Sequence, residues 1–292
     1  MSISLQLYLI GGIEILVPVM FLILYRRSHK FRISSVISGI GSYFLASNIL
    51  MGTFSMFMAS AGLDQQFWTN HSFLSNIVNV LLNVVFSNIT IFLVMKFVLK
   101  KKIRIYDAVA MGVSYWVAEA LMLSTSSISY ARIASMSAEG RLKEMVTESL
   151  PLDQLEEYAS NLQTLGISSF YIQVLGIIVL SIISAVICVF LFHAVKRDNL
   201  KFLWMTMGVH LLILTMMNLS LAYGGDIPYI IANVVAAAIA IVIYMQYWKW
   251  YKEQQMELSR KKQEYKQRQK AATGNVISVK VSEGNSDTEE QD

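Results

Sequence analysis

Two ionisable side chains lie deep within apolar stretches of this chain. Glu119 occupies the middle of the run AVAMGVSYWVAEALML, and His210 ends the segment WMTMGVH. An ionisable side chain at the centre of a membrane costs about 2.5 to 3.5 kcal/mol on insertion scales. A buried carboxylate and imidazole can share a proton, bind a metal or activate a water, or they can form a packing hydrogen bond. Glu119 and His210 are therefore the candidate catalytic residues.

A second set of side chains is polar but neutral. It lies on the third span and comprises Asn76, Asn79, Asn83, Ser87, Asn88 and Thr90. Steps of three and four residues place most of these side chains on one face of a helix. Such groups either bond neighbouring helices, at about 0.6 to 2 kcal/mol each, or line a hydrophilic substrate path. The candidate binding residues, expected to line a cavity, are Asn83, Ser87, Asn88 and Tyr115.

The composition identifies the class of protein. The chain has 292 residues, of which 55% are hydrophobic and 15% charged, and its mean hydropathy is +0.50. These values exclude a soluble globular protein, so we expect a multi-pass protein of the cell membrane. The single cysteine, Cys188, excludes a disulfide framework and a cysteine-rich metal site. The N-terminus has no basic region and no small-residue cleavage site, so we interpret it as the first membrane span.

Seven apolar stretches are long enough to cross about 30 Å of hydrocarbon, which takes roughly 20 residues. They cover residues 5–25, 33–61, 72–99, 106–125, 168–194, 200–222 and 228–248. The expected fold is all-α, a polytopic membrane helical bundle. Lysine and arginine are concentrated after the first, third and fifth spans. The positive-inside rule therefore predicts an outside N-terminus and a cytoplasmic C-terminus.

The sequence divides into three parts. Residues 1–248 form the transmembrane bundle, with an extracytoplasmic helical loop at 126–167 that is either a lid or a connecting hairpin. Residues 249–270 form a basic cytoplasmic juxtamembrane helix. Because glutamates alternate with its basic residues, we expect this helix to contact anionic lipid and not nucleic acid. Residues 271–292 are acidic, small and polar, and are predicted to be disordered.

Four segments share their order and spacing with a known family of membrane proteins. They are GIGSYF at 39–44, MKFVLKKK at the end of the third span, GVSYWVAEALM on the fourth and WMTMGVH on the sixth. Together they resemble the YhfC family of intramembrane proteases, over residues 5–248. The resemblance implies a relationship to the CAAX-processing and bacteriocin-processing proteases, in which glutamate and histidine act within a membrane bundle.

The resemblance implies a charged site that the third helix lacks. The family pattern there is similar to FEExxRY, with a lysine further on. Anchoring that pattern on Phe86 and Lys96 places Ser87 and Asn88 at the two glutamates and Ile91 at the arginine. Three charged side chains are replaced by neutral ones.

The later helices keep part of the implied site. On the fourth, a pattern similar to GxGHGGxE, anchored on Gly112, keeps Glu119 but places Tyr115 at the histidine. On the fifth, an expected histidine falls near Ser184, and the sixth keeps His210. The resemblance therefore implies the protease fold with an incomplete set of charged residues.

Three functions follow from these residues. The first is a pseudoenzyme of intramembrane-protease-like fold that binds a membrane protein, peptide or lipid. The second is an active intramembrane peptidase with a rearranged Glu119 and His210 site. The third is a small transporter or a permease-like partner of a transport ATPase. A zinc site takes about three protein ligands and one open position. Glu119 and His210 supply two, so we expect no cofactor, with an under-liganded zinc as the alternative.

Overall fold

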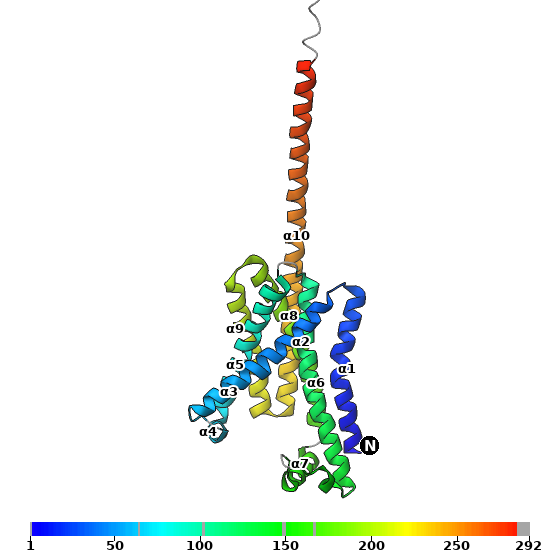
Figure 1. Cartoon of the computed structure of the whole chain (residues 1–292), viewed down its shortest axis with the longest axis vertical. Coiled ribbons are helices and arrows are strands. Elements are labelled where there is room, and N and C mark those ends of the chain that lie inside the picture. Colours follow the sequence, from blue (N-terminus) through cyan, green and yellow to red (C-terminus); the bar gives the residue numbers. More distant parts are fainter. Residues whose placement is uncertain (1, 64, 101–102, 148–149, 166–167, 285–292) are drawn as a thin grey trace, which may run out of the picture. The chain divides into compact units, whose positions relative to one another are not determined.

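The computed structural model describes residues 2–63, 65–100, 103–147, 150–165 and 168–284 (Figure 1). Within these ranges every named element is helical, and seven helices are long and apolar enough to cross a membrane. The predicted all-α bundle is confirmed, and the chain is a multi-pass membrane protein. The seven spans are Ile3–Ser28, Ile33–Ser60, Ser72–Leu99, Ile105–Ala138, Phe170–Arg197, Leu200–Gly224 and Asp226–Tyr265.

The first three spans differ in regularity. The first is α1, Ile3–Ser28, and the second consists of α2 (Ile33–Tyr43), the π-helix η1 (Phe44–Leu50) and α3 (Met51–Ser60). After the short α4 (Gln65–Asn70), the third joins α5 (Ser72–Leu93) to the π-helix η2 (Val94–Leu99). π-helical turns are rare and occur frequently at functional sites. The π-helix η1 therefore makes the second span a candidate to contribute to a functional site.

The rest of the chain begins with α6, Ile105–Ala138, and ends with α10, Asp226–Gly284. Between them lie the 3₁₀-helix η4 (Leu142–Met145), α7 (Leu152–Leu165), α8 (Ser168–Arg197), α9 (Leu200–Leu219) and the π-helix η5 (Ser220–Gly224). The predicted spans agree with these helices to within a few residues, except at the ends of α6 and α10.

Helix α6 continues to Ala138, whereas the sequence predicts its span to end near residue 125. Residues 126–138 are less apolar but contain no proline or glycine, so nothing interrupts the helical hydrogen bonds. Gly140, with a φ of 67°, follows directly after the helix end. A glycine in that conformation is a common helix stop, so the first part of the predicted loop is helical.

Helix α7 packs against this extension of α6. Its predicted apolar edge is buried at Leu155 and Leu162, in a cluster with Leu7 of α1 and with Ala131 and Ile133 of α6. A lid would have to break this contact to open. The choice between a lid and a connecting hairpin stays a prediction.

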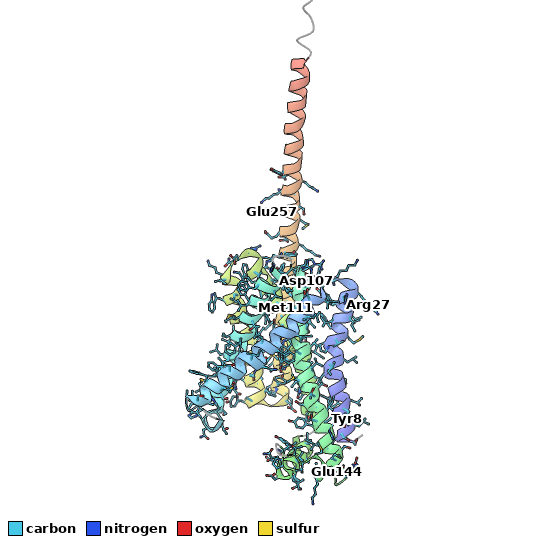
Figure 2. The ribbon with its side chains drawn as sticks, viewed as in Figure 1. Tyr8, Arg27, Asp107, Met111, Glu144 and Glu257 are labelled. Carbon is cyan, nitrogen blue, oxygen red and sulfur yellow. The ribbon has the colours of Figure 1, made fainter. Side chains whose placement is uncertain are left out.

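Asp107 ties the start of α6 to the loop between α1 and α2. Its carboxylate is almost fully buried and accepts hydrogen bonds from the backbone N–H of Arg32 (2.8 Å) and of Arg104 (2.9 Å). The Arg104 guanidinium donates in turn to the carbonyl of Lys30 (2.6 Å). Arg27 and Asp107 lie at one end of the bundle, and Tyr8 and Glu144 lie at the other (Figure 2).

The chain forms two compact units, residues 1–241 and the part from Val242 onward. In the second unit, α10 carries stacked aromatic rings at Tyr244, Trp248 and Tyr251. Further on, Glu257 pairs with Lys261 at 2.7 Å. The helix continues to Gly284, where the sequence predicts disorder from 271; residues 285–292 lie outside the described residues.

Helix α6 packs at backbone distance against two neighbours. A Cβ added to Gly39 of α2 would collide with the Ser114 hydroxyl and the Met111 carbonyl of α6. One added to Gly112 of α6 would collide with the Ser184 carbonyl of α8. Small residues at such contacts let membrane helices pack closely. These glycines therefore determine how near α2 and α8 lie to α6.

Replacing Gly112 by alanine tests this packing. We expect G112A to lower the thermal unfolding midpoint of the purified protein by several degrees, because overpacking costs about 1–3 kcal/mol. Gly208 of α9 is the matched control, since a Cβ there meets nothing within 4 Å. G208A should leave the midpoint unchanged or raise it. Equal midpoints for both variants would contradict the close contact.

Candidate functional site

Tyr115 is the centre of a polar cluster inside the bundle. Its side chain is buried, with 4% exposed, and its hydroxyl lies within hydrogen-bonding reach of Ser47 on η1 and Ser87 on α5. Its ring packs edge-on against Tyr43 of α2, with centroids 5.4 Å apart. The thiol of Cys188 on α8 is close enough for an electrostatic interaction with the Tyr115 hydroxyl. Tyr115 thus joins four spans.

Glu119 follows Tyr115 by one turn of α6 and is half-buried. The hydroxyl of Tyr43 lies within hydrogen-bonding reach of its carboxyl group. Tyr43 also lies within reach of Ser47. Glu119 is therefore connected to the Tyr115 cluster through a phenol, which can donate to a carboxylate without carrying charge.

His210 lies in a separate part of the network, on α9. The amide Nδ2 of Asn88 is 2.8 Å from His210 Nδ1 and donates to the Val84 carbonyl at 2.7 Å. Since the amide nitrogen is a donor, His210 Nδ1 is the acceptor and the imidazole is neutral, with its proton on Nε2. Both side chains are buried. The pair links α5 to α9.

The described contacts do not bring Glu119 and His210 together. Glu119 has Tyr43 as its partner, and His210 has Asn88. The connection between them runs through Tyr43, Tyr115 and the neighbouring residues Ser87 and Asn88. The arrangement holds the carboxyl and the imidazole in place by neutral hydrogen bonds, and neither side chain is poised to move the other's proton.

A small cavity adjoins Tyr115. It offers about 50 Å³ to the centres of water molecules and is lined by Ala46, Ser47, Met51, Asn83, Phe86 and Tyr115. Since a single water needs roughly 10–15 Å³ on this measure, the cavity has room for a few waters. Of the four predicted binding residues, Asn83 and Tyr115 line it, Ser87 reaches the Tyr115 hydroxyl, and Asn88 lies toward His210.

Sequence reasoning did not select two residues of this cluster, Tyr43 and Ser47. Tyr43 lies in the GIGSYF segment, and both follow Gly39 at helical steps of four. Gly39 is where α2 touches α6. A close-packed glycine followed by polar residues on the same face is therefore the signal that was available.

The sequence of this chain matches the model of a known protein family. The model describes the YhfC intramembrane metalloprotease and matches residues 13–251. The chain belongs to this family. The match spans every element that contributes to the Tyr115 cluster. Searches of curated proteins and of solved structures found no match.

Four of the residues that the resemblance aligns with charged positions of the YhfC pattern have contacts in this part of the bundle: Ser87, Asn88, Tyr115 and Ser184. Ser87 and Tyr115 lie within hydrogen-bonding reach, and Asn88 contacts His210. Ser184 hydrogen-bonds with Cys188 on α8, which lies beside Tyr115. These positions, scattered over four helices of the sequence, form one neighbourhood.

The name of the YhfC family implies a bound metal ion. The side chains around Glu119 and His210 would have to supply its ligands. A zinc ion in a protease takes about three ligands from His, Cys, Asp and Glu. Among the described residues no group of three or more such side chains could hold a metal ion. The groups next to Glu119 and His210 are a phenol and an amide. This donor set does not fit a zinc site.

The Asn88 contact can be tested through stability. We expect N88L to destabilise the protein by about 1–3 kcal/mol, because His210 Nδ1 would be left buried without a donor. The thermal midpoint of the purified protein measures this change. Asn79, which is exposed on the same helix, is the matched control, and N79L should have little effect. An N88L midpoint equal to that of N79L would contradict the assigned contact.

Proposed function

We propose that this protein binds a segment of another membrane protein or a peptide, and does not hydrolyse it by the family's metal-dependent chemistry. The observation that carries the proposal is the neutral character of the cluster around Tyr115. Ser87, Asn88 and Tyr115 stand where the family pattern has charged residues, and hydroxyl and amide contacts take their place.

The chemistry of peptide hydrolysis supports this proposal. Attack on a peptide bond needs a base or metal to generate hydroxide and a donor or cation to stabilise the oxyanion. Here the carboxyl of Glu119 has a phenol as its partner, and the imidazole of His210 has an amide. Neither partner is a cation or one of the His, Cys, Asp and Glu side chains that bind zinc.

The same groups suit recognition of a peptide backbone. An unwound segment within a membrane exposes N–H and C=O groups that need partners. Asn83, Ser47 and Tyr115 present both donors and acceptors at the cavity. The cavity has room for only a few waters, so the bound segment would insert only a loop or a single turn. Most of its length would stay in lipid or against the surface of the bundle.

The substitution E119Q tests the proposal. We expect cells that carry E119Q to keep most of the protein's function, because an amide can still accept a hydrogen bond from Tyr43. Crosslinking and mass spectrometry of native membranes should recover the same intact partner with wild type and with E119Q. Cleavage of a defined membrane substrate by the purified protein, with or without added zinc, would refute the proposal if E119Q abolished it.

The second partner that we propose is anionic lipid, bound by the basic part of α10. Residues 249–270 carry lysines and arginines that each gain about 1 kcal/mol near an anionic surface. We expect trypsin to cleave this segment several-fold more slowly in liposomes that contain phosphatidylserine than in pure phosphatidylcholine. High salt should abolish the difference because it screens surface charge. Equal cleavage rates in both liposomes would exclude lipid binding by this helix.

A further inference from the structure

A second buried acid lies away from the Tyr115 cluster, in α1. The side chain of Glu14 is completely buried. Its Oε2 accepts a hydrogen bond from the Ser127 hydroxyl of α6 at 3.0 Å, and its Oε1 accepts one from the Gln173 amide of α8 at 3.2 Å. One carboxyl group thus joins three spans. Both carboxyl oxygens therefore have a donor.

The charge of Glu14 has no cation among its described contacts. Ser127 and Gln173 are neutral, and a buried charge costs several kcal/mol unless it is paired. Intramembrane carboxylates accordingly pair with a partner or mark an ion path. Glu14 is therefore neutralised either by a proton or by a bound cation.

A further hydroxyl on the interface between α1 and α6 has no partner. The hydroxyl of Ser124 is buried and makes no hydrogen bond. It lies 3.4 Å from the position that a Cβ on Gly11 would take. Gly11 precedes Glu14 by one turn of α1, and Ser124 precedes Ser127 by one turn of α6, so the hydroxyl faces the same interface. Because it makes no other hydrogen bond, this hydroxyl is free to serve as a ligand.

We propose that Glu14, Ser124, Ser127 and Gln173 form a binding site for a sodium ion. Hard cations take oxygen ligands from carboxylates, carbonyls and hydroxyls. A single carboxylate balances one monovalent charge, which favours sodium over a divalent ion. Rotating the Gln173 amide by half a turn presents its oxygen to the ion, and the two serine hydroxyls present their lone pairs.

The observed spacings suit such an ion. Protein oxygens hold a cation of similar size, Ca²⁺, at about 2.3–2.6 Å, so two oxygens at right angles around it lie roughly 3.3–3.7 Å apart. The present separations from the Glu14 oxygens are 3.0 Å to Ser127 and 3.2 Å to Gln173. The ligands would move apart by a few tenths of an ångström on binding. Gln173 is only partly buried, so it offers the side from which an ion enters.

This site is independent of the Tyr115 cluster, and it holds α1, α6 and α8 together whether or not the protein cleaves a peptide. A bound sodium ion would neutralise Glu14 and stabilise the packing of these three spans. The ion is therefore a structural ligand, distinct from any substrate.

Thermal unfolding of the purified full-length protein tests the site. At equal ionic strength, sodium chloride should raise the unfolding midpoint by about 3 °C or more over choline chloride, once sodium is well above its Kd. The shift should disappear in E14Q and weaken in S124A. E119Q is the matched control, because it removes the other intramembrane acid, and it should keep the full shift.

Carbodiimide labelling gives a readout that does not depend on the folding of E14Q. Dicyclohexylcarbodiimide modifies carboxyl groups in apolar surroundings, and mass spectrometry locates the adduct. Sodium should slow labelling of Glu14 in wild type several-fold and leave labelling of Glu119 unchanged. Equal midpoints in sodium and choline, together with equal labelling of Glu14, would overturn the proposal. Such a result would mean that a proton alone neutralises Glu14.

Discussion

The close contact of α6 with α2 and α8 is the constraint on which the rest of the structure depends. At Gly39 and Gly112 these helices touch at backbone distance. In a membrane, helices gain little from the hydrophobic effect, so close packing and hydrogen bonds between them must provide the stability. Because α6 is held this tightly, the side chains that follow along it, Tyr115 and Glu119, project into the protein and not into lipid. The polar cluster is a consequence of this packing.

The two intramembrane acids on either side of this contact have different surroundings. Glu119 is half-buried and has a tyrosine as its partner. Glu14 is completely buried, with a serine and a glutamine as its donors. A carboxylate in an apolar interior loses favourable hydration. Both acids therefore depend on neutral donors from neighbouring helices.

The sequence predicted most of the fold because the membrane leaves few alternatives. Seven apolar stretches must become helices, since only helices satisfy their own backbone in hydrocarbon. The extension of α6 to Ala138 could not be predicted from hydropathy, because residues 126–138 are helical for lack of a breaker and not because they are apolar. The orientation of the termini stays a prediction.

The site was less predictable than the fold. The polar stripe on the third span indicated Asn83, Ser87 and Asn88. The spacing of the residues shows which face they share, but it does not show which residue of another helix each one contacts. Asn88 turned out to contact His210, 122 positions later in the chain. Ser47 was missed because it lies on the second span, outside the polar stripe of the third span that indicated the other residues. Tertiary contacts of this kind leave no trace in local periodicity.

The neutral residues around Tyr115 also form a physically consistent set. Removing one partner of a buried ion pair costs about 3–5 kcal/mol, because it leaves the other charge uncompensated, whereas replacing the whole pair by neutral groups is often neutral or stabilising. Charged residues in contact are therefore expected to be lost together. Ser87 and Tyr115 are in contact, and Asn88 contacts His210, which stays neutral beside an amide donor. In this cluster the partners of Glu119 and His210 are a phenol and an amide, and both of these groups are neutral.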